Sequence, residues 1–269
     1  MIARGLLPLT IAGLCTWAVQ GQVLFTGNYT ETFEALGPSG TTWLEGWGGF
    51  RYAGSGTIGA DLNLGVSTGS ATGGGLYNLG LSGETDRAVG SLASSSTIPG
   101  FGLRLRNGTG GPLDDLMFSG AMEQWRSGSS ATVDESMVCE YSLNAAGLFD
   151  DSATWLRLSG LDLLERQTGT TSAGALDGNL AENRLQMSAA LHNLGWADQG
   201  TLTLRWLDAD NTGSDGIYAL DDFGVTAIAS VPEPGSISLC LLGAGAVGLL
   251  RRRWRRGPQP TAVQPVARS

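Results

Sequence analysis

Residues 201–207 read Thr-Leu-Thr-Leu-Arg-Trp-Leu, in which polar and apolar side chains alternate through the first six residues. Successive side chains of a β-strand point to opposite faces, so Leu202, Leu204 and Trp206 share one face and the polar residues between them share the other. A strand with one buried and one solvated face is typical of antiparallel sheets. The stretch therefore predicts a β-strand whose apolar face belongs to the core.

The same alternation recurs elsewhere in the chain. It appears at 101–106, where apolar residues alternate with arginines, and at 137–143, where Cys139 falls on the apolar face. Between such runs lie clusters of turn-forming residues, at 70–75, 107–112, 128–130, 167–174 and 211–216. Many short strands joined by Gly-rich turns predict an all-β fold, an antiparallel two-sheet sandwich of the jelly-roll or concanavalin-like type.

The N-terminus has the pattern of an export signal. Arg4 supplies a positive start, residues 5–19 form an apolar run too short to span a bilayer comfortably, and the small Gly21 follows. This order predicts a signal peptide at 1–21, with a buried N-terminal helix as the alternative. The folded ectodomain is then expected at 22–230, which is long enough for one self-sufficient core.

The charge of this ectodomain differs from that of the whole chain. The chain carries a formal net charge of −9, and all 16 of its basic residues are arginine. Nine of these arginines and 24 of the 25 acidic residues lie within 22–230, so this segment carries a net charge of −15. Such a surface repels nucleic acid and anionic headgroups and attracts divalent cations. We therefore expect no nucleic-acid partner.

The C-terminal segment combines three elements in a set order. The first is a strand-breaking tetrapeptide, Val231, Pro232, Glu233 and Pro234. The second is an apolar run at 237–250. The third is a basic cluster that consists of Arg251, Arg252, Arg253, Arg255 and Arg256. Proline fixes φ and lacks a donor, so the ectodomain is expected to end before this segment.

The apolar run predicts one transmembrane helix. Its 14 residues would be about 21 Å long as a helix at about 1.5 Å per residue, against a hydrocarbon core of roughly 30 Å. Flanking residues of low charge extend the run, and arginines can snorkel to the interface. We expect a single span at about 235–252, with a polar cytoplasmic tail at 257–269 and the ectodomain outside.

This Pro-Glu-Pro, helix and arginine-cluster order at 231–256 resembles the PEP-CTERM sorting signal. The resemblance implies recognition of the tail by an exosortase, which is a membrane-embedded cysteine transpeptidase. It further implies export, a transient inner-membrane anchor, and transfer to the cell surface or extracellular matrix of a Gram-negative bacterium. The polar residues 257–269 depart from the pattern, because the signal usually stops soon after the arginines.

The ectodomain carries phrases that resemble uncharacterised β-sandwich modules with the same tail. They are Gly75-Leu76-Tyr77-Asn78 with Asp86-Arg87-Ala88-Val89-Gly90-Ser91, Phe101-Gly102-Leu103-Arg104-Leu105, Glu123-Gln124-Trp125-Arg126, Leu176-Asp177-Gly178-Asn179, Leu204-Arg205-Trp206-Leu207-Asp208 and Ala219-Leu220-Asp221-Asp222-Phe223. The resemblance spans most of 25–228 and implies architecture and location, with no activity attached.

The residue inventory argues against catalysis. His192 is the only histidine, so Ser-His-Asp, Cys-His and multi-histidine metal chemistries are unavailable in their usual forms. Cys139 is the only cysteine within 22–230 and is expected to be a buried packing thiol. Glycosidase chemistry needs two carboxylates, and Glu123 beside Trp125 is the first candidate. We expect no enzymatic activity.

Two binding hypotheses remain open. Calcium prefers oxygen ligands of the kind supplied at alternate positions by Asp208, Asp210, Asn211 and Asp215, although an acidic hairpin loop has the same composition. A structural calcium ion is therefore a hypothesis. Tryptophans could bind a glycan, with Trp155 as an exposed platform and Trp43 and Trp47 in a Gly-rich loop; packing at the ends of the sandwich is the alternative.

The last strand raises a separate question. If it alternates regularly, Asp221 lies on the face of Phe223 and Val225 and is buried. A buried carboxylate needs a cation or an arginine such as Arg126 or Arg205, whereas a bulge at Asp221-Asp222 would remove that need.

From the whole sequence, we expect a non-enzymatic surface or matrix protein that serves adhesion, exopolysaccharide association or biofilm formation. A carbohydrate-binding module or glycan-active hydrolase is the alternative.

Overall fold

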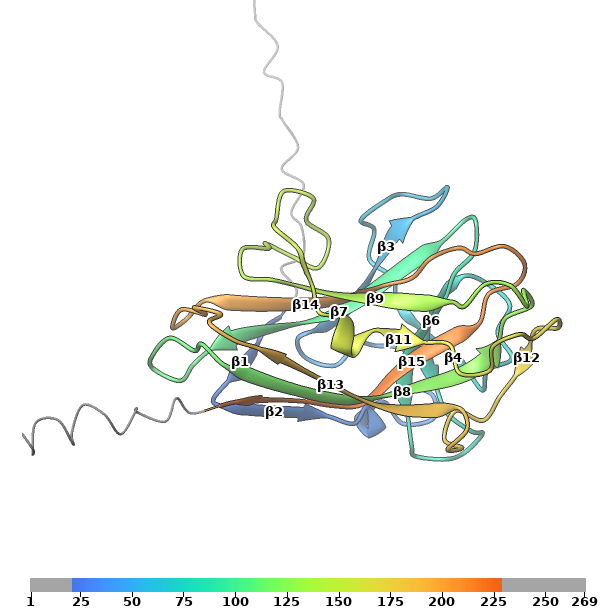
Figure 1. Ribbon diagram of the computed structural model, residues 1–269, viewed down its shortest axis with the longest axis horizontal. Helices are drawn as coiled ribbons and strands as arrows, with labels where there is room; N and C mark the ends of the chain where they lie inside the picture. Colours follow the sequence, from blue (N-terminus) through green and yellow to red (C-terminus); the bar gives the residue numbers. More distant parts are fainter. Residues whose placement is uncertain (1–20, 229–269) are drawn as a thin grey trace, which may run out of the picture. The chain divides into compact units, whose positions relative to one another are not determined.

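The computed structural model describes residues 21–228, which form two β-sheets packed face to face (Figure 1). The first sheet consists of β1 (Val23–Phe25), β3 (Trp47–Ala53), β7 (Ile98–Asn107), β9 (Ser136–Ser142), β10 (Leu156–Arg157), β11 (Leu163–Leu164) and β14 (Thr201–Leu207). The second consists of β2 (Asn28–Glu31), β4 (Leu64–Ser67), β5 (Gly75–Leu79), β6 (Ala88–Leu92), β8 (Leu116–Ser127), β12 (Gly174–Ala175), β13 (Arg184–Leu191) and β15 (Ile217–Ala227). Two 3-10 helices, η1 (Glu34–Leu36) and η2 (Ser159–Leu161), complete the described part. The predicted all-β, two-sheet sandwich is confirmed.

Strands that lie side by side come from distant parts of the chain. The first sheet runs β1-β7-β14-β9-β10, with β3 also paired to β7 and β11 to β9. The second runs β12-β8-β15-β6-β5-β4, with β13 also paired to β8 and β2 to β15. Most pairs are antiparallel as predicted, but β1–β7 and β4–β5 are parallel. The alternation of side chains shows which faces of a strand are buried but not which strands are its neighbours. The two parallel pairs, which need crossover connections, were therefore not predicted.

Most predictions for the two ends of the chain concern residues that the structure does not describe. The signal peptide at 1–21 reaches the described part only at Gly21. The sorting segment 231–256, its helix at 235–252 and the tail 257–269 lie wholly outside it. Within residues 21–228, no helix is long and apolar enough to cross a membrane.

The strand predicted at 201–207 is β14, an interior strand of the first sheet. It pairs with β7 along its whole length and with β9 from Thr203 onward. Leu202, Leu204 and Trp206 are fully buried, as the alternation predicts. Cys139, on the neighbouring strand β9, is also fully buried, and burial raises the pKa of its thiol well above the usual value. The predicted packing role of this cysteine agrees with its position.

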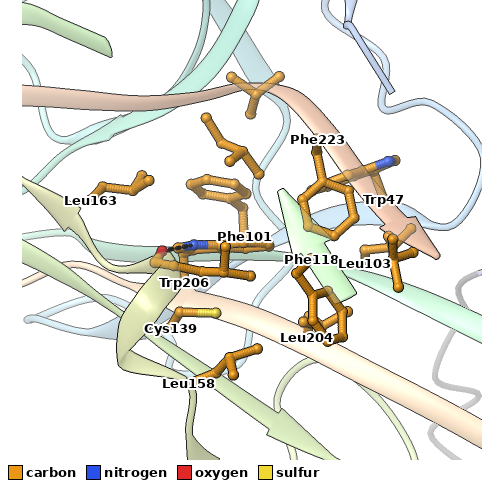
Figure 2. Packing of buried hydrophobic residues seen from close by; sticks show 14 of the residues in the cluster. Trp47, Phe101, Leu103, Phe118, Cys139, Leu158, Leu163, Leu204, Trp206 and Phe223 are labelled. Carbon is orange, nitrogen blue, oxygen red and sulfur yellow. Dashed lines mark hydrogen bonds between the residues drawn. The ribbon is translucent and has the colours of Figure 1, made fainter. Parts of the chain in front are cut away.

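The core is organised around an aromatic stack (Figure 2). The Trp206 ring stacks on Phe101 with centroids 5.4 Å apart and on Trp47 at 6.1 Å. From the second sheet, Phe223 meets Trp206 edge to face at 5.8 Å. The buried Trp206 Nε1–H donates to the Leu161 carbonyl at 2.8 Å, so the indole leaves no polar group unsatisfied. The two sheets are thus joined through rings from both.

The position of Trp47 differs from the prediction, which placed this residue in a loop. It lies in β3 and is buried in the core, where its Nε1–H donates to the Tyr29 hydroxyl at 2.8 Å. Its neighbours Gly48 and Gly49 belong to the same strand. The glycines suggested a loop, but in β3 they leave room for packing, since a Cβ at Gly49 would lie 2.2 Å from a Leu76 methyl group.

Candidate functional site

A bulge in β15 sets the position of Asp221. Asp221 pairs with Ala121, yet Gly224 pairs with Ser119, so Asp222 and Phe223 together lie opposite a single residue of β8. Asp222 takes the left-handed conformation with φ 47°, which is uncommon for a residue other than glycine. The extra residue shifts the alternation, and Asp221 therefore lies on the face opposite to Phe223.

Of the two possibilities considered for this strand, regular alternation and a bulge, the bulge is present. Ile217 and Ala219 pack with Trp125 in a small apolar cluster, whereas Phe223 and Val225 belong to the main core. Asp221 lies on the same face of β15 as Ile217 and Ala219, outside the main core. It is nevertheless 1% exposed, so the bulge does not remove its need for a partner.

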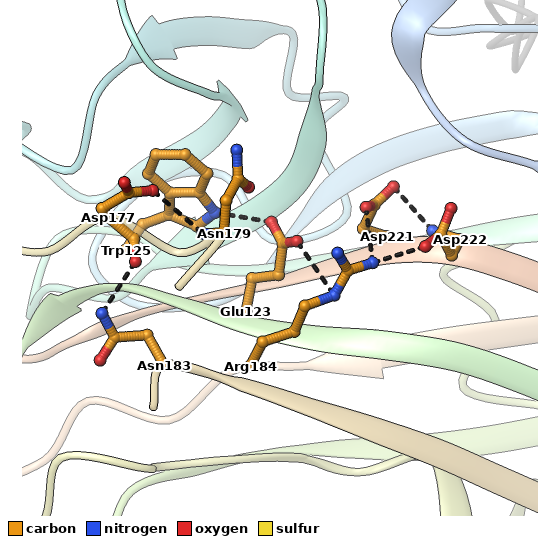
Figure 3. Close-up of polar contacts among 8 residues, drawn as sticks. All are labelled: Glu123, Trp125, Asp177, Asn179, Asn183, Arg184, Asp221 and Asp222. Carbon is orange, nitrogen blue, oxygen red and sulfur yellow. Dashed lines mark hydrogen bonds and ion pairs between the residues drawn. The ribbon is translucent and has the colours of Figure 1, made fainter. Parts of the chain in front are cut away.

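The partner is Arg184, not Arg126 or Arg205 (Figure 3). Its guanidinium lies 3.2 Å from Asp221 Oδ2 and 2.5 Å from Asp222 Oδ2, and its Nε lies 3.5 Å from Glu123 Oε1. Arg184 on β13 pairs across the strand with Glu123 on β8. The next outward position of β8 is Ala121, opposite Asp221. A short side chain there leaves the guanidinium free to reach across β8.

Glu123 is held in place by Trp125 and by the turn before β13. The Trp125 Nε1–H donates to Glu123 Oε2 at 3.0 Å, and both side chains are buried. The Trp125 carbonyl accepts from Leu176 N at 2.8 Å, and Asn183 O accepts from Gln124 N at 2.8 Å. These bonds fix the turn at 177–183 over the indole.

Burial shifts the acid-base behaviour of the two enclosed carboxyls. It raises the pKa of Glu123 to about 7, while the Trp125 hydrogen bond and the Arg184 charge act in the opposite direction. Burial likewise raises the pKa of Asp221 to about 8, and the Glu123 charge adds to this rise. Each carboxyl therefore disfavours ionisation of the other.

Glu123 was the first candidate for carboxylate catalysis. It is 1% exposed beneath the 177–183 turn, and one of its oxygens is bound by Trp125. A general acid must come within hydrogen-bond reach of its substrate. In this arrangement Glu123 and Asp221 instead face Arg184 and join three strands, β8, β13 and β15.

A second acidic group lies at the end of β14, in the predicted calcium loop. Asp208 and Asp215 are buried, whereas Asp210 is exposed and Asn211 is half-buried. Asp208 Oδ2 accepts from Ser91 Oγ at 2.5 Å, and Asp215 Oδ1 accepts from Asn211 N at 3.0 Å. Two of the four predicted ligands are thus enclosed and engaged by the protein.

Glu135 belongs to this group and was not foreseen. Its Oε2 accepts from Gly216 N at 2.7 Å and from the Tyr218 hydroxyl at 2.9 Å. Burial, followed by the Glu135 charge among the Coulomb effects, raises the pKa of Asp208 to about 7 and of Asp215 to about 8. No local motif could place Glu135 here, because it lies more than 70 residues before Asp208 in the sequence.

Within residues 21–228, no group of three or more His, Cys, Asp or Glu side chains is arranged to hold a metal ion. Asp208 and Asp215 meet hydrogen-bond donors of the protein instead. The calcium hypothesis for Asp208, Asp210, Asn211 and Asp215 stays a prediction, and binding would require these side chains to turn from their present partners.

The predicted glycan platform Trp155 is half-buried. The Arg205 guanidinium covers its ring at 3.5 Å from the centroid, and Arg205 also pairs with Glu140 at 2.7 Å. Trp43 is half-buried too, with its Nε1–H bonded to the Leu62 carbonyl and its ring stacked on Phe101 at 6.4 Å. Trp155 is thus not the exposed platform that was expected, and Trp47 lies inside the core. Glycan binding by Trp155 and Trp43 stays a prediction.

Residues 230–256 match the model of the PEP-CTERM protein-sorting motif. The tail is therefore a PEP-CTERM sorting signal, which indicates a surface protein that is exported and sorted by an exosortase after membrane-anchored transit. The predicted identity of the tail is confirmed. No curated protein sequence matches the chain.

Several solved β-sandwich structures are similar to the described domain. The K2 cleaved adhesin domain of Lys-gingipain is 13% identical, with 75% of this chain and 98% of that one covered and a TM-score of 0.40. The K1 domain of Lys-gingipain from Porphyromonas gingivalis W83 is 16% identical, with 75% and 99% covered and a TM-score of 0.39. The xylan-binding module CBM15 is 13% identical, with 76% and 100% covered and a TM-score of 0.34. Similarities this distant carry no inference about ligands.

Replacing Gly178 tests the contact between the turn and Trp125. A Cβ at this position would lie 2.3 Å from Trp125 Nε1, so Gly178→Ala should displace the indole from Glu123. We expect a loss of about 1–3 kcal/mol in the free energy of unfolding, typical of overpacking, measured by urea denaturation. Gly174→Ala is the matched control, because a Cβ there meets nothing within 4 Å. Equal stability of the two variants would contradict this contact.

The calcium hypothesis predicts a rise in Tm. Calcium at about 100 times its Kd would stabilise the folded state by about 2.7 kcal/mol, which is several degrees in Tm. Differential scanning calorimetry with calcium or with a chelator measures the shift. Asp215→Asn should abolish it, whereas Asp151→Asn, an exposed acid away from this loop, should not. An identical wild-type Tm in the two conditions would rule the hypothesis out.

Proposed function

We propose that this protein is a non-enzymatic surface or matrix component that an exosortase sorts through its PEP-CTERM tail, and that its ectodomain serves adhesion, exopolysaccharide association or biofilm formation. The observation that carries the proposal is the match of residues 230–256 to the sorting motif. We assign it to a Gram-negative bacterium, with a transient inner-membrane anchor before delivery to the surface or matrix. Exosortase, the membrane and extracellular polysaccharide are the proposed partners.

The end of the sandwich supports processing at the tetrapeptide. β15 ends at Ala227, and the Ile228 N–H donates to the Asp115 carbonyl at 2.9 Å. Cleavage near 231–234 would therefore fall beyond the last described hydrogen bond of the domain. Proline at 232 and 234 prevents the strand from continuing into the cleavage region. The proposed cut would release the sandwich without breaking one of its strands.

The acidic ectodomain limits which polysaccharides it could meet. With a net charge of −15 over 22–230, it would repel an anionic polymer unless divalent cations lay between them. A neutral polysaccharide meets no such barrier. The proposed association therefore favours a neutral polymer, or an acidic one in the presence of calcium or magnesium.

The sorting part of the proposal predicts a defect when the arginine cluster is removed. Replacing Arg251, Arg252, Arg253, Arg255 and Arg256 by Ser removes the charges that hold the C-terminus in the cytoplasm. We expect at least a tenfold loss of correctly processed surface protein and a mis-sorted or prematurely secreted, still-folded ectodomain. Cell fractionation with an ectodomain antibody in an exosortase-bearing host measures this outcome.

Arg268→Ser is the matched control for that experiment, because it removes one tail arginine outside the cluster. It should be processed like the wild type. Normal retention and processing of the five-arginine variant would refute the role of the cluster in sorting.

A carbohydrate-binding module or glycan-active hydrolase is the second candidate, and the half-buried Trp155 favours it. A tryptophan face that stacks on a sugar ring contributes much of the affinity of such a site. Under the structural role that we prefer, Trp155→Ala should leave polysaccharide association within about twofold of wild type on a glycan array. A loss of about tenfold, with Leu156→Ala unchanged, would favour the module; Leu156 is the exposed neighbour.

A further inference from the structure

We propose that Glu123, Arg184, Asp221 and Asp222 form a proton-dependent latch that holds the 177–183 turn and strand β13 against β8 and loosens as the pH rises. The latch is on the face of the second sheet that carries the Trp125 cluster, outside the main core. It lies between three strands, since Glu123 is on β8, Arg184 on β13, and the two aspartates on β15 (Figure 3).

The first argument is the charge of the latch. Three carboxylates face one guanidinium, and Glu123 and Asp221 are each only 1% exposed. Asp86, from the connection between β5 and β6, adds a further negative charge that acts on Glu123. Asp222 is half exposed, so a fully ionised latch would place two carboxylates out of water against the single charge of Arg184, which is costly. Holding a proton removes that cost.

The second argument is the geometry of its central ion pair. Glu123 Oε1 and Arg184 Nε are 3.5 Å apart, and both atoms are buried without a hydrogen bond. By contrast, Arg205 donates to Glu140 from two nitrogens, at 3.0 and 2.7 Å. Arg157 similarly has one acidic partner, Asp162, at 2.5 Å. The shared Arg184 leaves its pair with Glu123 incompletely bonded, so ionisation of Glu123 gains little.

The third argument is what the latch holds. Within the described residues, β13 pairs with β8 alone, through all eight of its residues from Arg184 to Leu191. Such an edge strand belongs to the less stable part of a sheet. In the preceding turn, the Gln124 N–H donates to the Asn183 carbonyl and the Asn183 N–H donates to the Leu180 carbonyl. Arg184 is the first residue of β13 and directly follows Asn183, the last residue of the turn. Loosening at Arg184 would therefore affect both the strand and the turn.

The direction of the pH response follows from proton binding. In the closed state the pKa of Glu123 is about 7 and that of Asp221 about 8, both above the values of exposed carboxyls. The closed state therefore binds more protons than the open state between about pH 5 and pH 8. The stabilisation is complete below the ordinary carboxyl pKa, and it is lost as the pH rises through about 7 to 8. An alkaline exterior would loosen the strand, and acid would hold it closed.

Hydrogen exchange of the full-length protein in detergent, followed by mass spectrometry, tests the latch. After correction for intrinsic exchange, we expect residues 177–191 to exchange at least about tenfold faster at pH 9 than at pH 6, equivalent to at least about one pKa unit of linkage. Residues 98–107, in β7 of the other sheet, should change by less than about twofold. An equal change in the two segments would overturn the proposal.

Variants separate the latch from other titrating groups. Glu123→Gln retains an oxygen to accept from Trp125 but cannot ionise, and Asp221→Asn removes the second buried carboxylate. In the double variant the tenfold response of 177–191 should therefore fall to about twofold or less. Glu84→Gln, an exposed acid between β5 and β6, should retain the full response. Retention of the tenfold response in the double variant would also overturn the proposal. Should that variant fail to fold, the wild-type comparison of the two segments decides.

Discussion

The packing of Trp206 between the two sheets is the interaction on which the rest of the domain depends. Its ring stacks on Phe101 and Trp47 from its own sheet and meets Phe223 edge-on from the other. Burial of aromatic surface contributes most of the stabilisation at such a junction, and the offset and edge-to-face geometries add to it. The contact between the sheets is thus made by rings from both, while the position of β15 against β8 is set by their pairing within the second sheet.

The bulge in β15 lets one strand serve two environments. Phe223 must point into the core to meet Trp206, while Asp221 points to the other face of the sheet. Regular alternation would place both on the same side, because they are two residues apart. One extra residue, with Asp222 in the left-handed conformation, separates them. The bulge therefore connects the core to the charged cluster around Arg184.

The arginines of the domain and those of the tail lie in different surroundings. The ectodomain is strongly acidic, and its buried arginines are used inside the fold, as Arg205 is with Glu140 and Trp155. The arginines of the tail form a separate cluster at 251–256 within the sorting motif. These arginines thus fall into two groups, those that bridge within the sandwich and those that lie within the sorting motif.

The sequence by itself determined the strands with clear alternation and the identity of the tail, because both depend on residues that are near one another in the chain. Leu202, Leu204 and Trp206 were placed correctly from their spacing alone. Only the tertiary structure decided that Trp47 is buried, that Glu135 joins Asp208 and Asp215, and that Arg184 is the partner of Asp221. These depend on strand register and on contacts across the sandwich, since a single extra residue reverses which face a side chain occupies.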